Sequence, residues 1–475
     1  MTRNTKRNLK LAIVGGACAA GIALVVCEPL IRPADLPDAM SPAAPQRCIA
    51  IFLVCVALWF TNLIPLAATG LLALALLPLL GVLPERQAFA LFGNDAVFFM
   101  LGVFLLAAAT IATGLSKRMT LLALHRFDAS PSRLVTGVTI SAAALAMCMP
   151  AHAVAAMIYP ILVEVVDALG LKRGARYAKK LFLALAWGAI VGGVGTLLGG
   201  ARAPLALGLL HDAYPDERIG FVGWMIAALP VVLIMIVVAV LALRFRIPND
   251  IDDIKPATNM LRARVRRLGP MSGAERRLTL LGIATIAAWI TTSWHGVGLA
   301  VVGVVAASLL FVFRIVDWRS LQGYVNWGVL IMYGGAIALG KALAQTHALE
   351  WVARQVVGPT MPAFAVVVLM SIMALVLTEC ISNAAAVAVL LPIGFSLGDM
   401  TGVSPTMMTL AVTIPAGLAF LLPISTPPNA ISFAAGHYSV REVLQLGWPM
   451  SVASLIVLLG VMAVWWHLVL NINAW

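Results

Sequence analysis

Two apolar stretches in different halves of this chain share one plan, because each is interrupted near its middle by residues that break a helix. The first is interrupted at Pro150 and the second at Ser382, and each interruption is followed, at the same spacing, by another proline. Each stretch also precedes a second interrupted one, Gly192–Pro204 in the first half and Pro423–Asn429 in the second. Paired interruptions at corresponding places in two halves indicate a secondary transporter with its binding site at the repeat interface. The pattern predicts a protein that moves a small solute across a membrane.

The composition is that of a membrane protein. Hydrophobic residues make up 62% of the chain and charged residues only 11%, and the mean hydropathy is +1.00. Several apolar runs reach the roughly 20 residues that cross a bilayer as a helix. The basic segment Met1–Lys10 and the apolar run Leu11–Val26 fit either a cleaved signal peptide or a first membrane anchor. We expect the anchor, because the run nearly reaches a spanning length and no small-residue cleavage site stands out.

The formal net charge of +12 does not indicate a nucleic-acid partner. The basic residues gather in short segments between apolar runs, most densely at Arg262, Arg264, Arg266 and Arg267, where the positive-inside rule expects cytoplasmic loops. The charge therefore predicts orientation, with a cytoplasmic N-terminus and a multi-pass chain in the inner (plasma) membrane. Several tryptophans near segment ends are interpreted mainly as interfacial anchors: Trp187, Trp224, Trp318, Trp351, Trp466 and Trp475.

The sequence offers little for catalysis or for an organic cofactor. It has no glycine loop of the phosphate-binding type, which argues against an ATP-driven pump, and no His/Cys cluster at metal-ligand spacing. His152 and Glu379 alone do not make the cluster of His, Asp and Glu that a membrane-embedded enzyme needs. The cysteines lie in or beside apolar runs, so disulfides are not expected to organise the fold. We expect neither an enzyme nor an organic cofactor.

The apolar segments predict an all-α polytopic membrane protein of inverted-repeat fold, with about 11 transmembrane helices and two re-entrant hairpins. The hairpins are expected at 134–168 and 361–397, and each is followed by a broken helix, at 181–210 and 404–434. Non-helical backbone at membrane depth persists only where protein or a wet cavity satisfies its polar groups, so the breaks should form one central site. The predicted domains are 1–47 (N-terminal cytoplasmic tail, first transmembrane helix and external loop), 48–245 (first inverted repeat), 246–277 (basic cytoplasmic linker) and 278–475 (second inverted repeat).

Polar residues at the second pair of breaks have the chemistry of a sodium site. Helix N-terminal ends favour anions, while free carbonyls at C-terminal ends, with hydroxyl or amide oxygens, suit Na⁺. Prolines in the following break remove N–H groups and keep that helix broken. We assign one Na⁺ site to Thr378, Asn383 and the backbone around Ser425–Pro427. The alternative is that Ser382 and Asn383 only satisfy kinked backbone.

The motifs Thr378–Ala384 and Ser425–Ala430 resemble those of the divalent anion/sodium symporter (DASS) family, and the similarity covers nearly the whole chain. That family carries dicarboxylates, tricarboxylates or sulfate. Its signature is a Ser-Asn-Thr triplet at each hairpin tip and a Thr-Pro-Pro-Asn-like break in each following helix. The resemblance implies the same Na⁺ site, a homodimer formed through a scaffold made by the first part of each repeat, and a mobile transport domain made by the hairpins and broken helices. That domain would cross the lipid bilayer by an elevator-type mechanism.

Matched position by position and read with this chain's own substitutions, the motifs predict two sets of site residues. The substrate-binding set is Pro150, Ala151, His152, Arg202, Ser382, Asn383, Ala384, Thr426 and Pro427. The Na⁺ set is Thr378, Ser382, Asn383, Ser425 and Pro427.

The first-half motif departs from the family pattern. Pro150, Ala151 and His152 stand where the triplet is expected, and of the expected sodium ligands only the Gly199 carbonyl remains. The second break carries Arg202 inside an apolar helix, where an arginine costs at least about 2.5–3.5 kcal/mol. One hypothesis is that Arg202 supplies the positive charge of the missing Na⁺ and pairs with the substrate's carboxylate or sulfate through its guanidinium fork. The other is that it snorkels to the outer interface.

Two further titratable residues have two interpretations each. His152 either hydrogen-bonds the anion, with a titration near neutral pH that permits proton coupling, or is a satisfied packing residue. Glu379, beside the second hairpin tip, either balances a nearby cation or has a structural role, and its family position favours the second.

These observations predict a secondary active transporter of small divalent anions, with a C4-dicarboxylate such as succinate preferred and sulfate second. One Na⁺ site is intact, so fewer sodium ions per cycle are expected than in symporters with two intact motifs. Three alternatives remain. The first is a Na⁺-independent anion exchanger or facilitator. The second is a same-fold transporter with other cargo, such as a Na⁺/H⁺ antiporter, although the paired buried acids it needs are missing. The third is a sensor that binds without transport.

Overall fold

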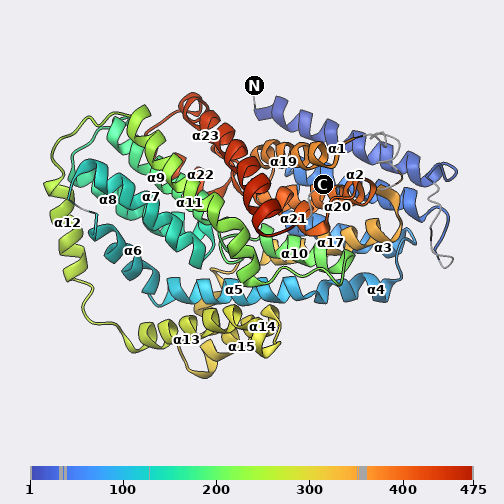
Figure 1. Ribbon diagram of the computed structural model, residues 1–475, viewed down its shortest axis with the longest axis horizontal. Helices are drawn as coiled ribbons and strands as arrows, with labels where there is room; N and C mark the ends of the chain where they lie inside the picture. Colours follow the sequence, from blue (N-terminus) through green and yellow to red (C-terminus); the bar gives the residue numbers. More distant parts are fainter. Residues whose placement is uncertain are drawn as a thin grey trace.

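The computed structural model describes residues 3–31, 36, 40–127, 129–349, 351 and 361–472 as a bundle of helices (Figure 1). No β-strand occurs in these ranges. Ten of their helices are long and apolar enough to cross a membrane, and two shorter apolar helices accompany them. The all-α polytopic fold predicted from the sequence is confirmed.

Eleven α-helices precede the predicted basic linker in the described part of the chain. They are α1 (Arg3–Val26), α2 (Ala44–Thr61), α3 (Leu66–Leu79), α4 (Glu85–Ala90), α5 (Asp95–Ala112), α6 (Leu115–His125), α7 (Pro131–Cys148), α8 (Ala151–Ala168), α9 (Arg176–Gly192), α10 (Arg202–Ala213) and α11 (Phe221–Arg246).

The predicted basic linker contains a helix that the sequence did not indicate, α12 (Lys255–Arg266), and the helices of the second half of the chain follow it. Its helices are α13 (Gly273–Ile290), α14 (Thr292–His295), α15 (Leu299–Val312), α16 (Trp318–Gln322), α17 (Trp327–Gln345), α19 (Ala363–Cys380), α20 (Asn383–Thr401), α21 (Pro405–Thr413), α22 (Pro427–Ala434) and α23 (Val440–Val461).

Two helical hairpins lie where the paired interruptions predicted them. In the first, Pro150 separates α7 from α8, and the residue before it, Met149, is extended because the proline ring disfavours a helical conformation there. In the second, the Ser382 side chain accepts a hydrogen bond from the Ala385 N–H (3.2 Å) and so caps the start of α20. A proline and an N-cap serine thus end a helix and restart it at equivalent places.

The two broken helices follow the hairpins. The segment between α9 and α10 is non-helical over Gly193–Ala201, and the segment between α21 and α22 holds a single 3₁₀ turn, Pro415–Gly417. Helix α22 restarts with Pro427 in its first turn, where a missing N–H costs nothing.

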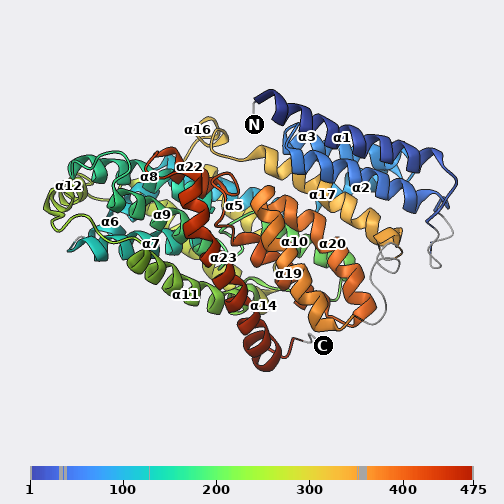
Figure 2. The ribbon, with the colours of Figure 1, turned by 90° about the horizontal axis from the view of Figure 1, so that it is seen from above.

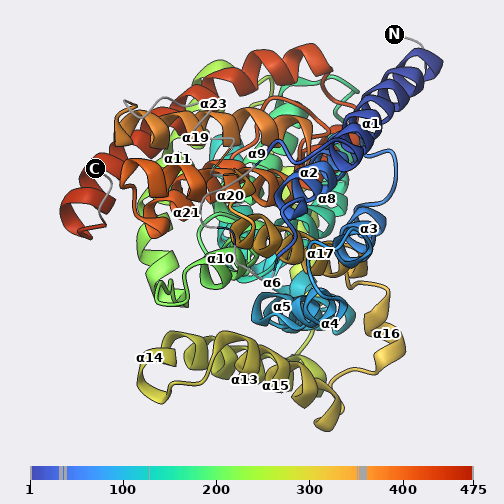
Figure 3. The same ribbon diagram turned by 90° about the vertical axis from the view of Figure 1, so that its right-hand side faces the viewer.

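One group of helices, here called the scaffold, comprises α1–α5 and α13–α17. Within it helices of the two halves of the chain pack against each other, α5 against α15 and α17 against α3. Both contacts need glycine: a Cβ at Gly102 would lie 2.6 Å from the Gly303 carbonyl carbon, and one at Gly335 would lie 2.2 Å from the Gly70 oxygen. Helices α13–α15 form a layer under α5 (Figure 3), while α1, α2, α3 and α17 lie side by side (Figure 2).

The other group, here called the hairpin group, comprises α7–α11 and α19–α23. The second half of each broken helix packs against the hairpin from the other half of the chain, α10 against α20 and α22 against α8. This exchange brings all four interruptions to one place.

The interpretation of the tryptophans as interfacial anchors is wrong for Trp187, Trp224 and Trp466, which are buried inside the protein. The Trp224 indole donates to the Val194 carbonyl (3.1 Å), and the Trp466 indole to the Ala227 carbonyl (2.9 Å), so their N–H groups are used internally. Trp318 is exposed, and Trp475 lies outside the described residues.

Candidate functional site

Four helix N-termini meet at one cavity of about 160 Å³. Helices α8, α10, α20 and α22 begin at Ala151, Arg202, Asn383 and Pro427, and each of these residues lines the cavity. First-turn N–H groups have no acceptor within their own helix, and helix N-terminal ends carry partial positive charge. Four such ends around one small space favour a bound anion.

All nine residues predicted to bind substrate line this cavity, namely Pro150, Ala151, His152, Arg202, Ser382, Asn383, Ala384, Thr426 and Pro427. Among the described residues that line it, Arg202 is the one side chain with a permanent charge, and no Asp or Glu contributes. The permanent charge on these described walls is therefore positive.

The Arg202 side chain points into the protein. It is 4% exposed, and its Nη2 donates to the Gly193 carbonyl (2.6 Å), in the break that precedes its own helix. No carboxylate lies within ion-pair distance of it in the described part of the chain. Its buried Nε has no hydrogen-bond partner. The guanidinium keeps donor capacity that the protein itself does not use.

Gly417, in the second break, gives Arg202 its room. A Cβ at Gly417 would lie 2.4 Å from both Cζ and Nε of Arg202, and one at Gly200 would lie 2.6 Å from its Nη1. Arg202 therefore reaches from the first broken helix to the second. The sequence reasoning missed Gly417, because a glycine before a break has many causes and only the fold shows what approaches it.

The oxygens of the first pair of breaks are occupied by donors of the chain itself. The Gly199 carbonyl accepts the Ala151 N–H (3.0 Å), the Met147 carbonyl accepts the Thr196 hydroxyl (2.6 Å), and the Gly193 carbonyl accepts Arg202. Each of these three carbonyl oxygens therefore already accepts a hydrogen bond from the chain.

The second pair of breaks differs, because oxygens outnumber donors. The Thr378 hydroxyl lies 2.7 Å from the Ala416 carbonyl and 2.9 Å from Asn383 Oδ1, and it has one hydrogen for the two acceptors. Three neutral oxygens thus meet with a single proton among them. Such a set, partly unwound backbone and partly side chain, fits Na⁺.

The other predicted sodium residues take different positions. Ser382, Ser425 and Pro427 line the cavity, whereas Thr378 lies behind Asn383 and does not. The Ser425 hydroxyl donates to the Leu422 carbonyl (2.7 Å) and accepts from Asn429 Nδ2 (3.1 Å), so it stabilises the break itself.

Glu379 holds the second break in place. Its carboxylate accepts the backbone N–H groups of three consecutive residues, Phe420 (2.7 Å), Leu421 (2.9 Å) and Leu422 (3.0 Å). The side chain is 5% exposed. These bonds tie the non-helical segment to the end of α19 and satisfy donors that the broken helix leaves free.

His152 is half buried and makes no hydrogen bond to another described residue. The scaffold also contributes to the cavity wall, through Phe104 on α5 and through Asn326 and Met332 on α17. These residues carry no sequence signal, because they meet the site only through the packing of the two helix groups.

Relatives of known name resemble this chain over most of its length. Sodium-dependent dicarboxylate transporter SdcS of Staphylococcus saprophyticus is 29% identical over 441 residues, which cover 86% of this chain and 84% of that protein. The protein of the same name from Staphylococcus aureus is 29% identical over 456 residues, with 90% and 86% coverage.

Two solved transporters share the fold. Neisseria gonorrhoeae MtrF, described as one of a class of antimetabolite efflux pumps, aligns with a TM-score of 0.59 at 13% identity, over 97% of this chain and 94% of that one. The Alcanivorax borkumensis YdaH transporter aligns with a TM-score of 0.54 at 16% identity, over 88% and 98%.

The family model described as the sodium:sulfate symporter transmembrane region matches residues 19–472. The family and the named relatives are transporters and not enzymes. With its convergent breaks and its anion-favouring cavity, this chain is a multi-pass membrane transporter that belongs to the divalent anion/sodium symporter family.

Proposed function

We propose that this protein transports a small divalent anion, with a C4-dicarboxylate such as succinate preferred and sulfate second. The observation that supports this cargo is the cavity in which four helix N-termini and Arg202 converge, with no acidic side chain among the described residues that line it. Its volume of about 160 Å³ is below the roughly 300–1,000 Å³ of pockets for drug-sized molecules. The relatives named as dicarboxylate transporters favour a dicarboxylate over sulfate.

Arg202 takes the place of one cation in this proposal. A buried guanidinium without a carboxylate partner is costly in a membrane, and a bound dianion would neutralise it. The free Nε and the fork geometry suit a carboxylate, which accepts two parallel hydrogen bonds. In the first half, the Gly193 carbonyl accepts a hydrogen bond from Arg202 and the Gly199 carbonyl accepts one from the Ala151 N–H. We therefore place no sodium ion there.

One Na⁺ binds in the second half, at Thr378, Asn383 and the carbonyl of Ala416. The ion would supply positive charge beside the anion and the oxygens would coordinate it. Ser382 and Ser425 contribute by shaping the hairpin tip and the break.

Movement follows the elevator-type mechanism in this proposal. The hairpin group would act as the transport domain, and the scaffold would stay fixed and join a second copy in a homodimer. The reciprocal glycine contacts inside the scaffold support a rigid frame. The arginines of the basic linker favour a cytoplasmic position for the linker, and with it a cytoplasmic N-terminus.

A second mode, Na⁺-independent anion exchange, is favoured by Arg202 alone. A fixed buried charge makes the empty transport domain costly to return, whereas a domain that carries an anion is neutralised. If the Na⁺ site binds too weakly to be occupied, the protein would work mainly as an exchanger.

The test of cargo is uptake of labelled succinate into proteoliposomes, with sulfate, citrate and acetate as competitors. Succinate should accumulate, sulfate should compete less strongly than unlabelled succinate, and acetate should not compete. If the folded protein shows saturable binding of none of these anions, the proposed function is refuted.

A further inference from the structure

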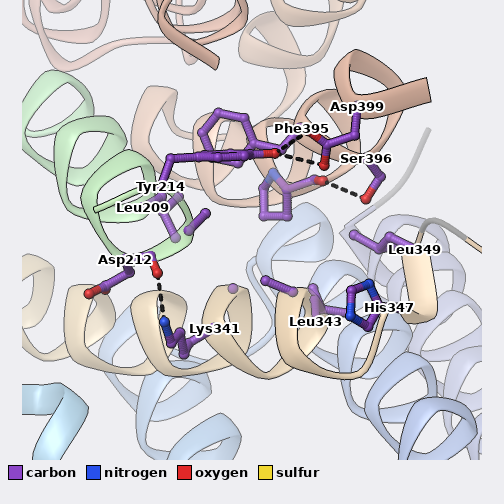
Figure 4. A pocket seen from close by; sticks show the side chains of 14 residues that line it. Leu209, Asp212, Tyr214, Lys341, Leu343, His347, Leu349, Phe395, Ser396 and Asp399 are labelled. Carbon is purple, nitrogen blue, oxygen red and sulfur yellow. Dashed lines mark hydrogen bonds between the residues drawn. The ribbon is translucent and has the colours of Figure 1, made fainter. Parts of the chain in front are cut away.

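Asp212, near the C-terminal end of α10, joins the hairpin group to the scaffold by two hydrogen bonds. Its carboxylate oxygen Oδ2 accepts from Asn94 Nδ2 (2.9 Å), and its backbone carbonyl accepts from Lys341 Nζ (2.6 Å). Asn94 precedes α5 and Lys341 lies in the last turns of α17, so one residue is held by scaffold helices of both repeats. Figure 4 shows the Lys341 side chain rising from α17 to the Asp212 carbonyl.

The donors of these bonds are positioned by the scaffold. Asn94 Oδ1 accepts the Ala96 N–H (2.8 Å) and caps α5, which leaves its amide nitrogen pointing to Asp212. Close packing continues along α10: a Cβ at Gly208 would lie 2.8 Å from the Ala96 Cβ, and one at Gly340 would lie 2.5 Å from Leu209 Cδ2. Helix α10 is therefore docked against α5 and α17 at this end.

Neighbouring polar contacts differ, because each joins helices of one group. Tyr214, beside α10, donates to Asp399 of α20 (2.7 Å), both in the hairpin group. Gln87 of α4 donates to Gln345 of α17 (3.2 Å), both in the scaffold. A rigid movement of one group past the other preserves these two contacts and breaks those of Asp212.

A cavity of about 250 Å³ lies next to the Asp212 contacts, between α17 and the helices α10 and α20 (Figure 4). Because this part of the interface is not filled by side chains, polar bonds contribute a large share of what holds the groups together here.

The Asp212 contacts and the anion cavity lie at opposite ends of α17. Asn326 and Val329, at the start of α17, line the anion cavity, whereas Lys341 lies one turn before the end of that helix. The anion cavity thus lies toward the start of α17 and the Asp212 contacts toward its end. Helix α11 runs from just after the Asp212 end of α10 to the basic linker, so with that linker in the cytoplasm the cavity end of α17 faces the cytoplasm.

We propose that Asp212, with Asn94 and Lys341, is a latch that holds the transport domain in the inward-oriented state and must open in each transport cycle. This proposal rests on the elevator mechanism proposed above. It places a residue that controls the translocation step outside the binding site. The latch acts on the rate of translocation and not on the affinity for the anion.

The test is a reversible cross-link of the latch in a variant whose six native cysteines are replaced. Asn94→Cys with Asp212→Cys, bridged by Hg²⁺, should lose succinate transport at least tenfold, keep succinate binding, and recover transport on addition of a thiol. The matched control is Gln87→Cys with Gln345→Cys, whose bridge lies within the scaffold and should leave transport unchanged. Full transport by the bridged latch pair would overturn the proposal, whereas absence of succinate binding in every variant would count against the cargo instead.

A second measurement does not depend on Asn94, whose replacement removes a helix cap. Leu209 lines the cavity beside the latch but is only 4% exposed in the latched state, so Leu209→Cys should react slowly with an external, membrane-impermeant maleimide and faster when the latch opens. Adding Lys341→Met should raise the labelling rate about tenfold, the factor expected for a lost charged hydrogen bond, while Lys341→Arg should restore the slow rate. Succinate affinity should stay within about twofold. Equal labelling rates with and without Lys341 would contradict the latch.

Discussion

The guanidinium of Arg202, at the start of one broken helix, lies directly against Gly417 in the break of the other. A Cβ at Gly417 would lie 2.4 Å from Cζ of Arg202, so no larger residue fits without moving the arginine. The two residues come from different halves of the chain, and their contact places the one permanent charge among the described lining residues beside both breaks.

Replacing Arg202 with alanine should remove anion binding. The variant loses the charged donor with the free Nε, and the Kd for succinate should rise by about 100-fold or more. Arg202→Lys keeps the positive charge but loses the forked guanidinium, so its Kd should lie between those of the wild type and Arg202→Ala. Isothermal titration in detergent measures all three proteins. Near-normal affinity in Arg202→Ala would show that the arginine does not bind the substrate.

Gly417→Ala should act only through Arg202. The added methyl group displaces the guanidinium, and the Kd for succinate should rise by about tenfold. In an Arg202→Ala background the same change should have no further effect, which a double-mutant cycle measures as a coupling energy of at least about 1 kcal/mol. Additive effects would mean that Gly417 serves the break independently of the arginine.

Glu379→Ala should destabilise the second break. Removing the carboxylate leaves three backbone N–H groups without their acceptor, at a cost of about 3 kcal/mol or more in the free energy of unfolding. The melting temperature in detergent should fall, and Na⁺ should no longer raise it because the Ala416 carbonyl, a proposed Na⁺ ligand, loses its position. Glu379→Gln keeps one acceptor oxygen and should fall less. An unchanged melting temperature in Glu379→Ala would contradict the role assigned to this carboxylate.

Thr378→Val should weaken Na⁺ binding selectively. The change removes one of three neutral oxygens and keeps the shape of the side chain, so half-maximal transport should need roughly tenfold more Na⁺. The control is Thr196→Val, which removes a hydroxyl near the first pair of breaks that donates to the Met147 carbonyl. That variant should keep the Na⁺ dependence of the wild type. Similar shifts in both variants would argue against a site confined to the second half.

His437, in the loop between α22 and α23, predicts a pH dependence of stability. Its ring stacks on Phe182, and burial, with Arg173 nearby, lowers the pKa of the imidazole below its ordinary 6.5. The folded protein therefore binds fewer protons than the unfolded chain, so this contribution to stability is complete above pH 6.5 and declines as the pH falls through the folded-state pKa. Melting temperatures between pH 5 and 8 should fall less steeply on the acid side in His437→Gln than in the wild type.

The hairpins and broken helices could be predicted from sequence because their causes are local. Pro150 and Ser382 end and restart helices through backbone sterics and capping, and these act on neighbours in the chain. The direction of the Arg202 side chain could not be predicted in this way. The arginine points inward because the Gly193 carbonyl accepts its hydrogen bond and Gly417 leaves space for its guanidinium, and both contacts depend on the fold.

Contacts between the two helix groups could not be predicted from the sequence either. The bonds of Asp212 to Asn94 and Lys341 join residues from three segments that only the reciprocal packing of the repeats brings together. The same holds for the buried tryptophans. The position of Trp224 near a segment end is typical of an interfacial anchor, but its indole N–H donates to the Val194 carbonyl in the first broken helix.

The central claim is that Arg202 stands in for one cation and that a single Na⁺ site remains. The initial rate of succinate uptake into proteoliposomes, measured against external Na⁺ at a fixed anion concentration, tests it most directly. The account predicts a hyperbolic dependence with a Hill coefficient near one. A sigmoidal dependence, with two or more sodium ions per cycle, would contradict the role of Arg202, and a rate that ignores Na⁺ would contradict the site at Thr378 and Asn383.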